Sequence, residues 1–185
     1  MCIIMVGEVT RAQHNMALKQ NGDGFSLFTA EQGLIKSPSE YQVRKALGQF
    51  GIWHYRIATS GTKDVSNIHP FRVCHSKCLL YHNGVLGEGK DTLSDTHALA
   101  EMLQDVSIGT AKSVLASLTD SGRFLLADAN DPHKFVVYGK WVADAGVLMS
   151  HRLVQPSYTT QYTSGAYTRY KGYGAIGASR LSEEE

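Results

Sequence analysis

The order of the apolar segments along this chain constrains its fold more than any other feature. Strand patterns rich in β-branched and aromatic residues come first, helix patterns lie in the middle, and strand patterns return. The expected strands are 2–9, 24–30, 53–58, 78–82, 123–127, 134–138 and 141–150, and the expected helices are 40–49, 94–105 and 109–120. This order favours an α+β domain of layered antiparallel sheets over a doubly wound parallel sheet.

Capping residues and apolar spacing set the expected limits of two helices. Serines on both sides of Pro38 are expected to cap the helix at 40–49, whose apolar face includes Tyr41. Ser94 is expected to cap the next helix, with Met102 facing the core. The opening strand does not alternate between apolar and polar residues, so we expect it to be buried on both faces.

Length and charge bound the classes of function. A chain of 185 residues with 43% hydrophobic content fits one domain with a sizeable core. Lysine and arginine total 18 against 17 acidic residues, so the chain lacks the basic field that a nucleic-acid partner requires. The longest apolar runs fall short of the ~20 residues of a membrane span, and the N-terminus shows no signal-peptide pattern. A cytoplasmic protein without a membrane partner is expected.

The composition changes abruptly near the C-terminus. From residue 155 the chain is rich in Tyr, Thr, Ser and Gly, and it ends in three glutamates. A segment with so little aliphatic content has little apolar surface to offset the entropy of ordering. We therefore expect a folded domain at 1–154 and a C-terminal tail at 155–185 that is mobile or docks on a partner.

A cysteine stands directly behind the initiator methionine. If the methionine is trimmed because the next side chain is small, Cys2 carries both a thiol and a free α-amine. The amine titrates at roughly 7.7–8.0 and can act as the base that the thiol needs to become a nucleophile. The alternative is that Cys2 is a small buried hydrophobic residue of the opening strand.

Three short motifs follow Cys2 in the chain. They are HYRIATSG at 54–61, YHNG at 81–84 and SDT at 94–96. In this order and spacing, the set resembles the class II glutamine amidotransferases, the glutaminase branch of the N-terminal nucleophile hydrolases. The resemblance covers about residues 2–150, and it includes DGF at 23–25 and the YGKW…SH stretch at 138–151. It implies a four-layer αββα sandwich of antiparallel sheets.

Recognition of glutamine requires one cation and one anion, because the free amino acid carries an α-carboxylate and an α-ammonium. The resemblance assigns the carboxylate to Arg56 and the ammonium to Asp95, and Thr59 is a third expected substrate-binding residue. Without the resemblance, Arg56 is equally consistent with a surface ion pair. Asp95 is then consistent with a first-turn carboxylate that complements the dipole of its helix.

The second motif has two interpretations. Asn-Gly is a strong turn signal between strands. An oxyanion hole, however, needs N–H donors from a side-chain amide and from a closely approaching backbone. The resemblance assigns these donors to the side chain of Asn83 and the backbone of Gly84, which makes both catalytic together with Cys2.

The resemblance implies hydrolysis of L-glutamine through a thioester on Cys2, giving glutamate and ammonia, with no metal or organic cofactor. Relatives that carry a synthetase domain have it further along the same chain, and this sequence shows none, so either a separate ATP-dependent ligase is the ammonia acceptor or the domain is a stand-alone hydrolase. Two alternatives stay open. The chain could be an inactive binding or structural module that keeps the fold, or it could hydrolyse another γ-glutamyl or linear amide.

The chain departs from the family pattern at several positions. Ser60 stands where a histidine is frequent, and His97 stands where a glutamate is common. Tyr55 and Ile57 flank the motif arginine, where tryptophan is frequent at the second of these places. The loop at 59–70, which folds over glutamine in relatives, is therefore expected to close differently.

Four cysteine and histidine residues crowd into a ten-residue stretch: His69, Cys74, His75 and Cys78. The C-x3-C spacing has no second pair downstream, so we expect packed or loop residues and no metal site. With three cysteines and no secretion signal, the thiols are expected to be reduced.

Two further expectations concern residues around the motifs. His54 and His82 are expected to be structural partners near the pocket, because the proposed nucleophile brings its own base. The late segment at 138–151 is expected to supply core strands and nothing catalytic, with Tyr138 and Trp141 as packing anchors.

Overall fold

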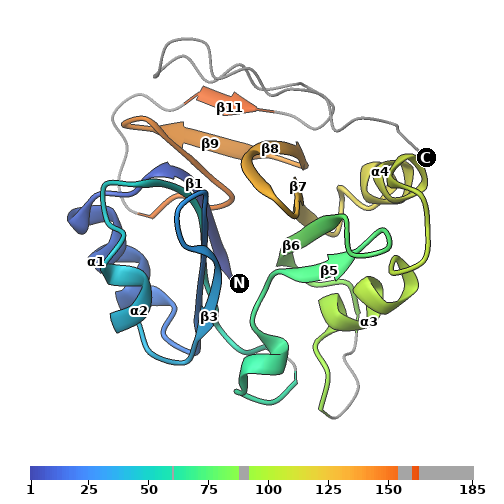
Figure 1. Ribbon diagram of the computed structural model, residues 1–185, viewed down its shortest axis with the longest axis horizontal. Coiled ribbons are helices and arrows are strands. Elements are labelled where there is room, and N and C mark those ends of the chain that lie inside the picture. The colour runs from blue at the N-terminus through green and yellow to red at the C-terminus, as the bar shows by residue number, and fades with distance from the viewer. Residues whose placement is uncertain (60, 88–91, 154–159, 163–185) are drawn as a thin grey trace.

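The computed structural model describes the chain except for residues 60, 88–91, 154–159 and 163–185. It contains helices and two antiparallel sheets, an α+β arrangement consistent with a layered sandwich (Figure 1). Ser60 and most of the expected tail lie outside the described residues.

The first sheet has the strand order β11-β9-β10-β1-β4-β2-β3, with antiparallel pairing throughout. Its strands are β1 (Ile3–Glu8), β2 (Phe25–Thr29), β3 (Gly33–Ser37), β4 (Phe50–Tyr55), β9 (Trp141–Asp144), β10 (Val147–Met149) and β11 (Thr160–Tyr162). The strand that follows Cys2 is therefore an interior strand of the sheet. One of the two edge strands, β11, comes from the segment that the sequence assigns to the tail.

The second sheet has the order β5-β6-β7-β8 and is also antiparallel. Its strands are β5 (Phe71–Val73), β6 (Cys78–Gly84), β7 (Gly122–Asp128) and β8 (Asp131–Tyr138). β6 carries the second motif and is an interior strand of this sheet.

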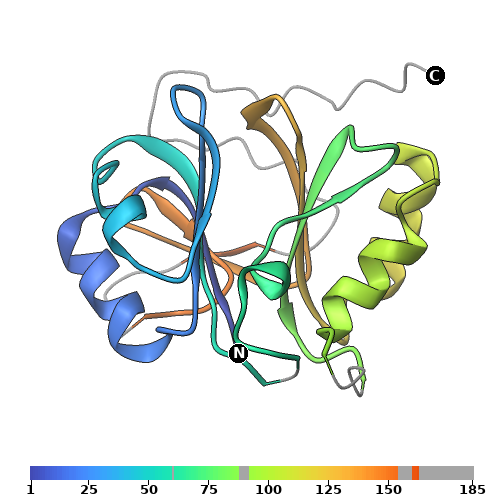
Figure 2. The ribbon, with the colours of Figure 1, turned by 60° about the horizontal axis from the view of Figure 1, so that its bottom comes forward.

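The helices lie on the outer faces of the two sheets (Figure 2). They are α1 (Arg11–Gln20), α2 (Tyr41–Arg44), α3 (Asp95–Met102) and α4 (Ile108–Ser117), with a short 3₁₀ helix η1 (Val65–Asn67). α1 and α2 pack on the first sheet, and α3 and α4 pack on the second. A separate apolar cluster lies between the sheets, with members on strands of both.

The burial of β1 confirms the expectation that this strand is covered on both sides. Ile3 and Met5 belong to the cluster under α1 and α2, whereas Ile4 and Val6 belong to the cluster between the sheets. All four side chains are at most 2% exposed. Successive side chains of a strand point to opposite faces, so a strand between two apolar layers shows no alternation in its sequence.

Helix α1 is not indicated by the apolar pattern, because its buried residues are Gln13, His14 and Ala17. A capping box starts this helix: Gln13 N donates to the Thr10 hydroxyl at 3.3 Å, and Thr10 N donates to Gln13 Oε1 at 2.9 Å. Polar contacts then replace much of the usual apolar stripe.

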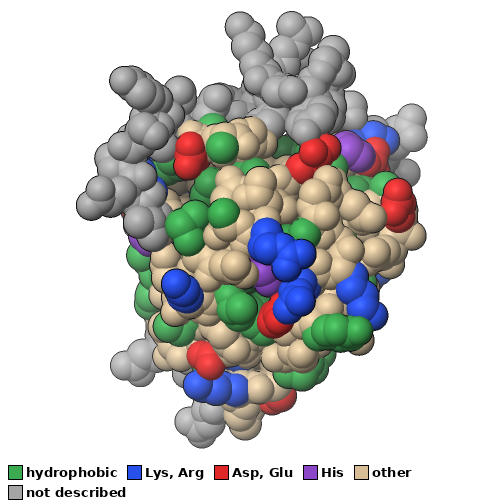
Figure 3. Space-filling view, turned by 90° about the vertical axis from the view of Figure 1, so that its left-hand side faces the viewer, with side chains coloured by type: hydrophobic (Ala, Val, Ile, Leu, Met, Phe, Trp, Pro, Cys, Tyr) green, Lys and Arg blue, Asp and Glu red, His purple; other side chains and the backbone are tan. Residues whose placement is uncertain are grey.

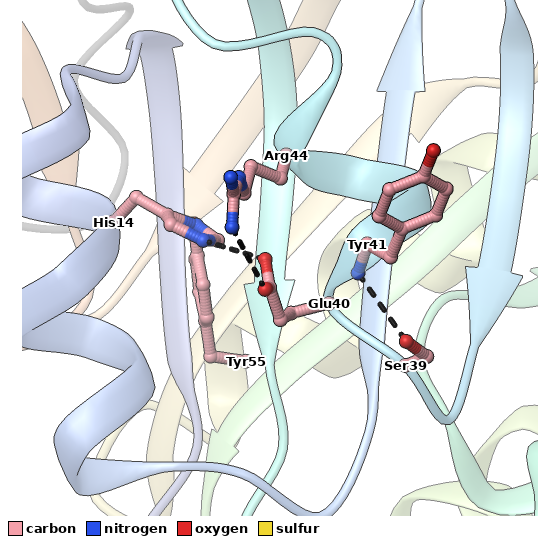
Figure 4. A network of polar contacts seen from close by, with 6 residues as sticks. All are labelled: His14, Ser39, Glu40, Tyr41, Arg44 and Tyr55. Atoms are coloured by element: carbon pink, nitrogen blue, oxygen red, sulfur yellow. Dashed lines mark hydrogen bonds and ion pairs between the residues drawn. The ribbon is translucent and has the colours of Figure 1, made fainter.

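His14 connects α1 to its neighbours (Figure 4). Its Nδ1 lies 2.9 Å from the Tyr55 hydroxyl of β4, and its Nε2 lies 3.1 Å from Glu40. Glu40 also lies 3.6 Å from Arg44 on α2. This network joins both helices to the first sheet through one buried imidazole. Figure 3 shows the molecule from the side that carries α1 and α2. Near the middle of this face, Lys and Arg side chains lie beside an acidic one.

The helix expected at 40–49 is wrong in extent and in the face that it buries. The observed helix ends at Arg44, Tyr41 is 59% exposed, and the N-cap residue Glu40 makes no side-chain capping bond. Gly48 has a φ of +85° and its N–H donates to Val9 O at 3.1 Å. The left-handed glycine is incompatible with a continuing helix, and its bond to the chain after β1 favours the turn.

Two other local expectations are corrected. Met102 is 76% exposed, and its neighbour Leu103, 3% exposed, enters the core instead. The strand expected at 141–150 is two strands, because Ala145 and Gly146 have positive φ values of 44° and 82° and form a turn.

The expected packing anchors Tyr138 and Trp141 are confirmed, with exposures of 4% and 0%. Trp141 Nε1 donates to Tyr138 O at 2.9 Å, which satisfies the polar end of the buried indole. Among the described residues, no helix combines the length and the apolar content that crossing a membrane would require.

Candidate active site

Cys2 lies immediately before β1, and the N-terminus lies at the lower edge of the molecule between the sheets in Figure 2. Its Sγ donates to Ile57 O at 3.9 Å. Burial raises the pKa of the Cys2 thiol, although the Ile57 contact, the terminal ammonium and Arg56 act in the opposite direction. A buried thiol with a raised pKa is protonated near neutral pH, so it needs an adjacent base before it can attack a carbonyl.

A small pocket beside Cys2 collects residues from distant parts of the sequence. Five of the six expected site residues line it: Cys2, Arg56, Thr59, Gly84 and Asp95. The other lining residues are Ile57, Asn67, His69, His82, Ser94 and Thr96. The sixth, Asn83, is fully buried beside Gly84 and is not part of the lining.

Arg56 follows β4 directly and is 3% exposed, so it is not the surface ion-pair residue of the alternative interpretation. Its backbone is fixed by Arg56 N donating to Gly24 O at 2.8 Å and by Asp23 N donating to Arg56 O at 3.0 Å. The DGF stretch therefore holds the arginine motif in place.

Asp23 also restrains the loop that follows Arg56. Its carboxylate accepts from Ala58 N at 2.9 Å and pairs with Lys63 at 2.8 Å. The hydrogen bond from Lys63 has the larger effect and that from Ala58 N the smaller, and together they hold the pKa of Asp23 below its usual value. The charge on Asp23 is thus maintained at neutral pH, and both ends of the segment beside Thr59 stay attached to it.

Asp95 is the first residue of α3, behind the N-cap Ser94, whose hydroxyl accepts from His97 N at 3.2 Å. The Asp95 carboxylate accepts from Leu86 N at 2.8 Å and from Thr96 N at 2.7 Å. It therefore links the end of β6 to the start of α3. The structural interpretation of Asp95 applies, and the same residue also faces the pocket.

Asn67 is a pocket residue that the sequence motifs do not identify. It is fully buried, and its Nδ2 donates to Thr92 O at 2.8 Å while its Oδ1 accepts from Ser94 N at 2.9 Å. Asn67 thus ties the loop after Arg56 to the segment that leads into Asp95. Gly61, with a φ of +69°, permits this close approach, because a Cβ there would lie 2.8 Å from Ser94 N.

Asn83 and Gly84 lie inside β6 and pair with Arg123 and Gly122 of β7, so the Asn-Gly pair is not a hairpin turn. A Cβ on Gly84 would lie 2.2 Å from Ser121 O and 2.6 Å from His82 Nε2. Close backbone approach therefore requires glycine here.

The side chain of Asn83 is anchored by a residue outside the motif. Its Nδ2 donates to Ser150 Oγ at 3.0 Å. Its Oδ1 has no hydrogen-bond partner among the described residues. One N–H of the amide is thus used by Ser150, and the second remains available as a donor.

Three buried histidines lie in or next to the wall of the pocket. His69 and His82 line it, and His54 stacks on His69 with ring centroids 4.5 Å apart. Burial lowers the pKa of His54 to about 3 and that of His82 to about 4, and it lowers the pKa of His69 well below the usual value. All three are neutral at pH 7, in keeping with structural rather than general-base roles.

These histidines make stability depend on pH. Their folded pKa values lie below the unfolded value of about 6.5, so below that pH the unfolded chain binds protons that the folded chain does not. Stability is therefore lost as pH falls from about 6.5 towards the folded values. We expect His54→Gln to reduce the loss between about pH 7 and about pH 5 by about 2 kcal/mol. Urea unfolding at both pH values measures this, with His133→Gln as the control. An unchanged pH dependence in His54→Gln would contradict the assignment.

The Cys/His cluster of the sequence is split in the structure. Cys74 and Cys78 flank the turn between β5 and β6 as free thiols, and Cys74 Sγ donates to Ser107 O at 4.0 Å. His69 turns instead towards the pocket. Within the described part of the chain, no group of three or more His, Cys, Asp or Glu side chains is placed to hold a metal ion.

Comparisons with known proteins give little beyond this geometry. No protein-family model matches the chain, and no curated protein matches it. Among solved structures, the chain is similar to the crystal structure of a predicted glutamine amidotransferase from Pseudomonas aeruginosa. The match has 16% identity and a TM-score of 0.47, over 89% of this chain and 90% of the other. A likeness this distant assigns neither a family nor a function to the chain.

Proposed function

We propose that this protein is a class II glutamine amidotransferase with the αββα fold of the N-terminal nucleophile hydrolases. It releases ammonia from L-glutamine through a thioester on Cys2. The observation that carries the proposal is the convergence of four separate segments on one pocket. Cys2 lies before β1, Arg56 after β4, Gly84 at the end of β6 and Asp95 at the start of α3.

The small side chain of Cys2 favours removal of the initiator methionine, whose present contacts lie at the surface and on Asn21. Met1 is 51% exposed, and its carbonyl accepts from Asn21 Nδ2 at 2.8 Å. The same Nδ2 lies 3.1 Å from Tyr55 O, so Asn21 holds the first peptide against β4. Removal of Met1 exposes the α-amine of Cys2 next to its own thiol, which supplies the base that the buried Cys2 needs.

The proposed reaction then proceeds in two steps. The α-amine takes the thiol proton, the sulfur forms a bond to the side-chain carbonyl carbon of glutamine, and Asn83 and Gly84 donate to the oxyanion. The C–N bond breaks as the amine returns the proton to the leaving nitrogen, and ammonia departs. Water, deprotonated by the amine, next attacks the thioester. The C–S bond breaks, releasing glutamate and restoring the Cys2 thiol.

Charge complementarity supports free glutamine as the substrate. Arg56, directly after β4 of the first sheet, and Asp95, the first residue of α3 on the second sheet, both line the pocket, and so does Thr59. The pair matches the α-carboxylate and the α-ammonium of one amino acid. In the proposed function, the ammonia passes to an acceptor bound by a separate ATP-dependent ligase.

Substitution of Arg56 tests this recognition. We expect Arg56→Ala to raise the KM for glutamine roughly 100-fold, because a buried charged hydrogen bond to the carboxylate is lost. Arg44→Ala, which removes an exposed arginine from α2, is the matched control and leaves KM unchanged. Ammonia release over a range of glutamine concentrations measures both.

Three other results would redirect the assignment. Undiminished turnover in Arg56→Ala would argue against recognition of an amino acid. Hydrolysis of another γ-glutamyl or linear amide, without competition by free glutamine, would replace glutamine as the substrate. A folded protein that hydrolyses none of these amides would favour a binding or structural module.

A further inference from the structure

Ser150 forms a polar link between the two sheets, at the level of the nucleophile. It follows β10 and is 1% exposed. Its backbone N–H donates to Ile4 O at 2.9 Å, and Ile4 N donates to its Oγ, also at 2.9 Å. These two bonds fix the hydroxyl to β1, two residues after Cys2.

The same hydroxyl oxygen reaches the other sheet. Asn83 Nδ2 on β6 donates to Ser150 Oγ at 3.0 Å. A hydroxyl oxygen has two lone pairs, and here both accept N–H groups, one from each sheet. Ile4 and Asn83 are therefore held at a fixed separation through one atom.

This link bears on the proposed reaction because the nucleophile and the oxyanion donor lie in different sheets. Cys2 precedes β1, whereas Asn83 is on β6. An oxyanion hole works only when its donors already point at the position that the oxygen will occupy, within a few tenths of an ångström. With one N–H held by Ser150, the direction of the second N–H of the Asn83 amide is set.

We propose that Ser150 is a positioning residue. It directs the second N–H of the Asn83 amide at the oxyanion that forms when the Cys2 sulfur attacks the side-chain carbonyl of glutamine. This inference rests on the proposed function. Ser150 is not among the residues that line the pocket beside Cys2, so it acts through Asn83. The late segment at 138–151, expected from sequence to be core and nothing catalytic, thus contributes a side chain to the site.

The test is a double-mutant cycle on glutamine hydrolysis. We expect Ser150→Ala to lower kcat roughly 10- to 100-fold and to change KM less than about threefold, because the orientation of a transition-state donor is lost while glutamine binding is retained. In an Asn83→Ala background, the same substitution is expected to lower kcat less than about threefold further. Ser26→Ala, which alters another buried serine of the first sheet, is the control and leaves kcat unchanged.

Two results of this cycle would overturn the inference. One is a kcat for Ser150→Ala within about threefold of the parent, and the other is an additive loss in the double variant. A merely structural serine would lower stability without this non-additivity.

A second readout does not depend on activity. In ¹H–¹⁵N spectra, we expect the side-chain N–H hydrogens of Asn83 to exchange with solvent faster in Ser150→Ala than in the parent. Unchanged exchange overturns the inference. If the parent hydrolyses no glutamine, the proposed function fails, and the exchange measurement still decides whether Ser150 anchors Asn83.

Discussion

Replacement of Cys2 with alanine is expected to reduce kcat for glutamine hydrolysis to background, a loss of roughly 10⁴-fold or more. The substitution removes the sulfur that forms the thioester, and no neighbouring group replaces it in the proposed reaction. Alanine is also small, so removal of Met1 is expected to proceed as in the parent. Ammonia release at saturating glutamine measures the effect.

A matched control comes from the second sheet. Cys74→Ala removes a buried thiol between β5 and β6, away from the pocket, and is expected to leave kcat within about twofold of the parent. Retention of more than a tenth of the activity in Cys2→Ala would show that another group is the nucleophile.

Replacement of Asn83 with alanine is expected to lower kcat roughly 10²- to 10³-fold with little change in KM. The side-chain amide donates to the oxyanion, which exists only after attack, so its loss raises the energy of the transition state and not that of bound glutamine. Steady-state kinetics separate the two parameters. Urea unfolding of the same variant shows how much stability the buried cavity costs.

Tyr81→Phe is the control for Asn83. Tyr81 lies on the same strand and is fully buried, and its hydroxyl makes no hydrogen bond among the described residues. We expect its removal to leave kcat unchanged. Equal losses of kcat in Asn83→Ala and Tyr81→Phe would indicate a general disturbance of β6, and would contradict a specific oxyanion role.

The strands were more predictable from sequence than the helices, for physical reasons that individual elements show. The opening strand lies between two apolar layers, so its unbroken apolar run indicates it directly. Helix α1 buries Gln13 and His14, and the partners of His14, Tyr55 and Glu40, are distant in sequence. A search for apolar residues at helical spacing does not find such a helix. Met102 has the right spacing but lies at the end of α3, where the chain turns Leu103 inward.

The residues of the candidate site were also predictable only in part. The sequence motifs identify Cys2, Arg56 and Asp95, and the fold brings these three residues to one pocket. Asn67 belongs to none of the motifs, and Ser150 lies in the SH pair of the late stretch, whose sequence assigns it no role; the contacts of the two residues join segments 25 and 67 residues apart along the chain. A short-range pattern contains no record of such partners, so only the folded structure identifies them.

The most direct test of the central claim is the intact mass of untagged protein before and after exposure to 6-diazo-5-oxo-L-norleucine, a glutamine analogue that alkylates a nucleophile of this kind. A glutaminase that uses Cys2 is expected to show a mass that lacks Met1 and to gain one adduct in the parent protein, with no adduct in Cys2→Ser. Retention of Met1 together with the absence of any adduct would rule out Cys2 as the nucleophile of a glutaminase, because Cys2 would then have neither its base nor a glutamine-shaped site.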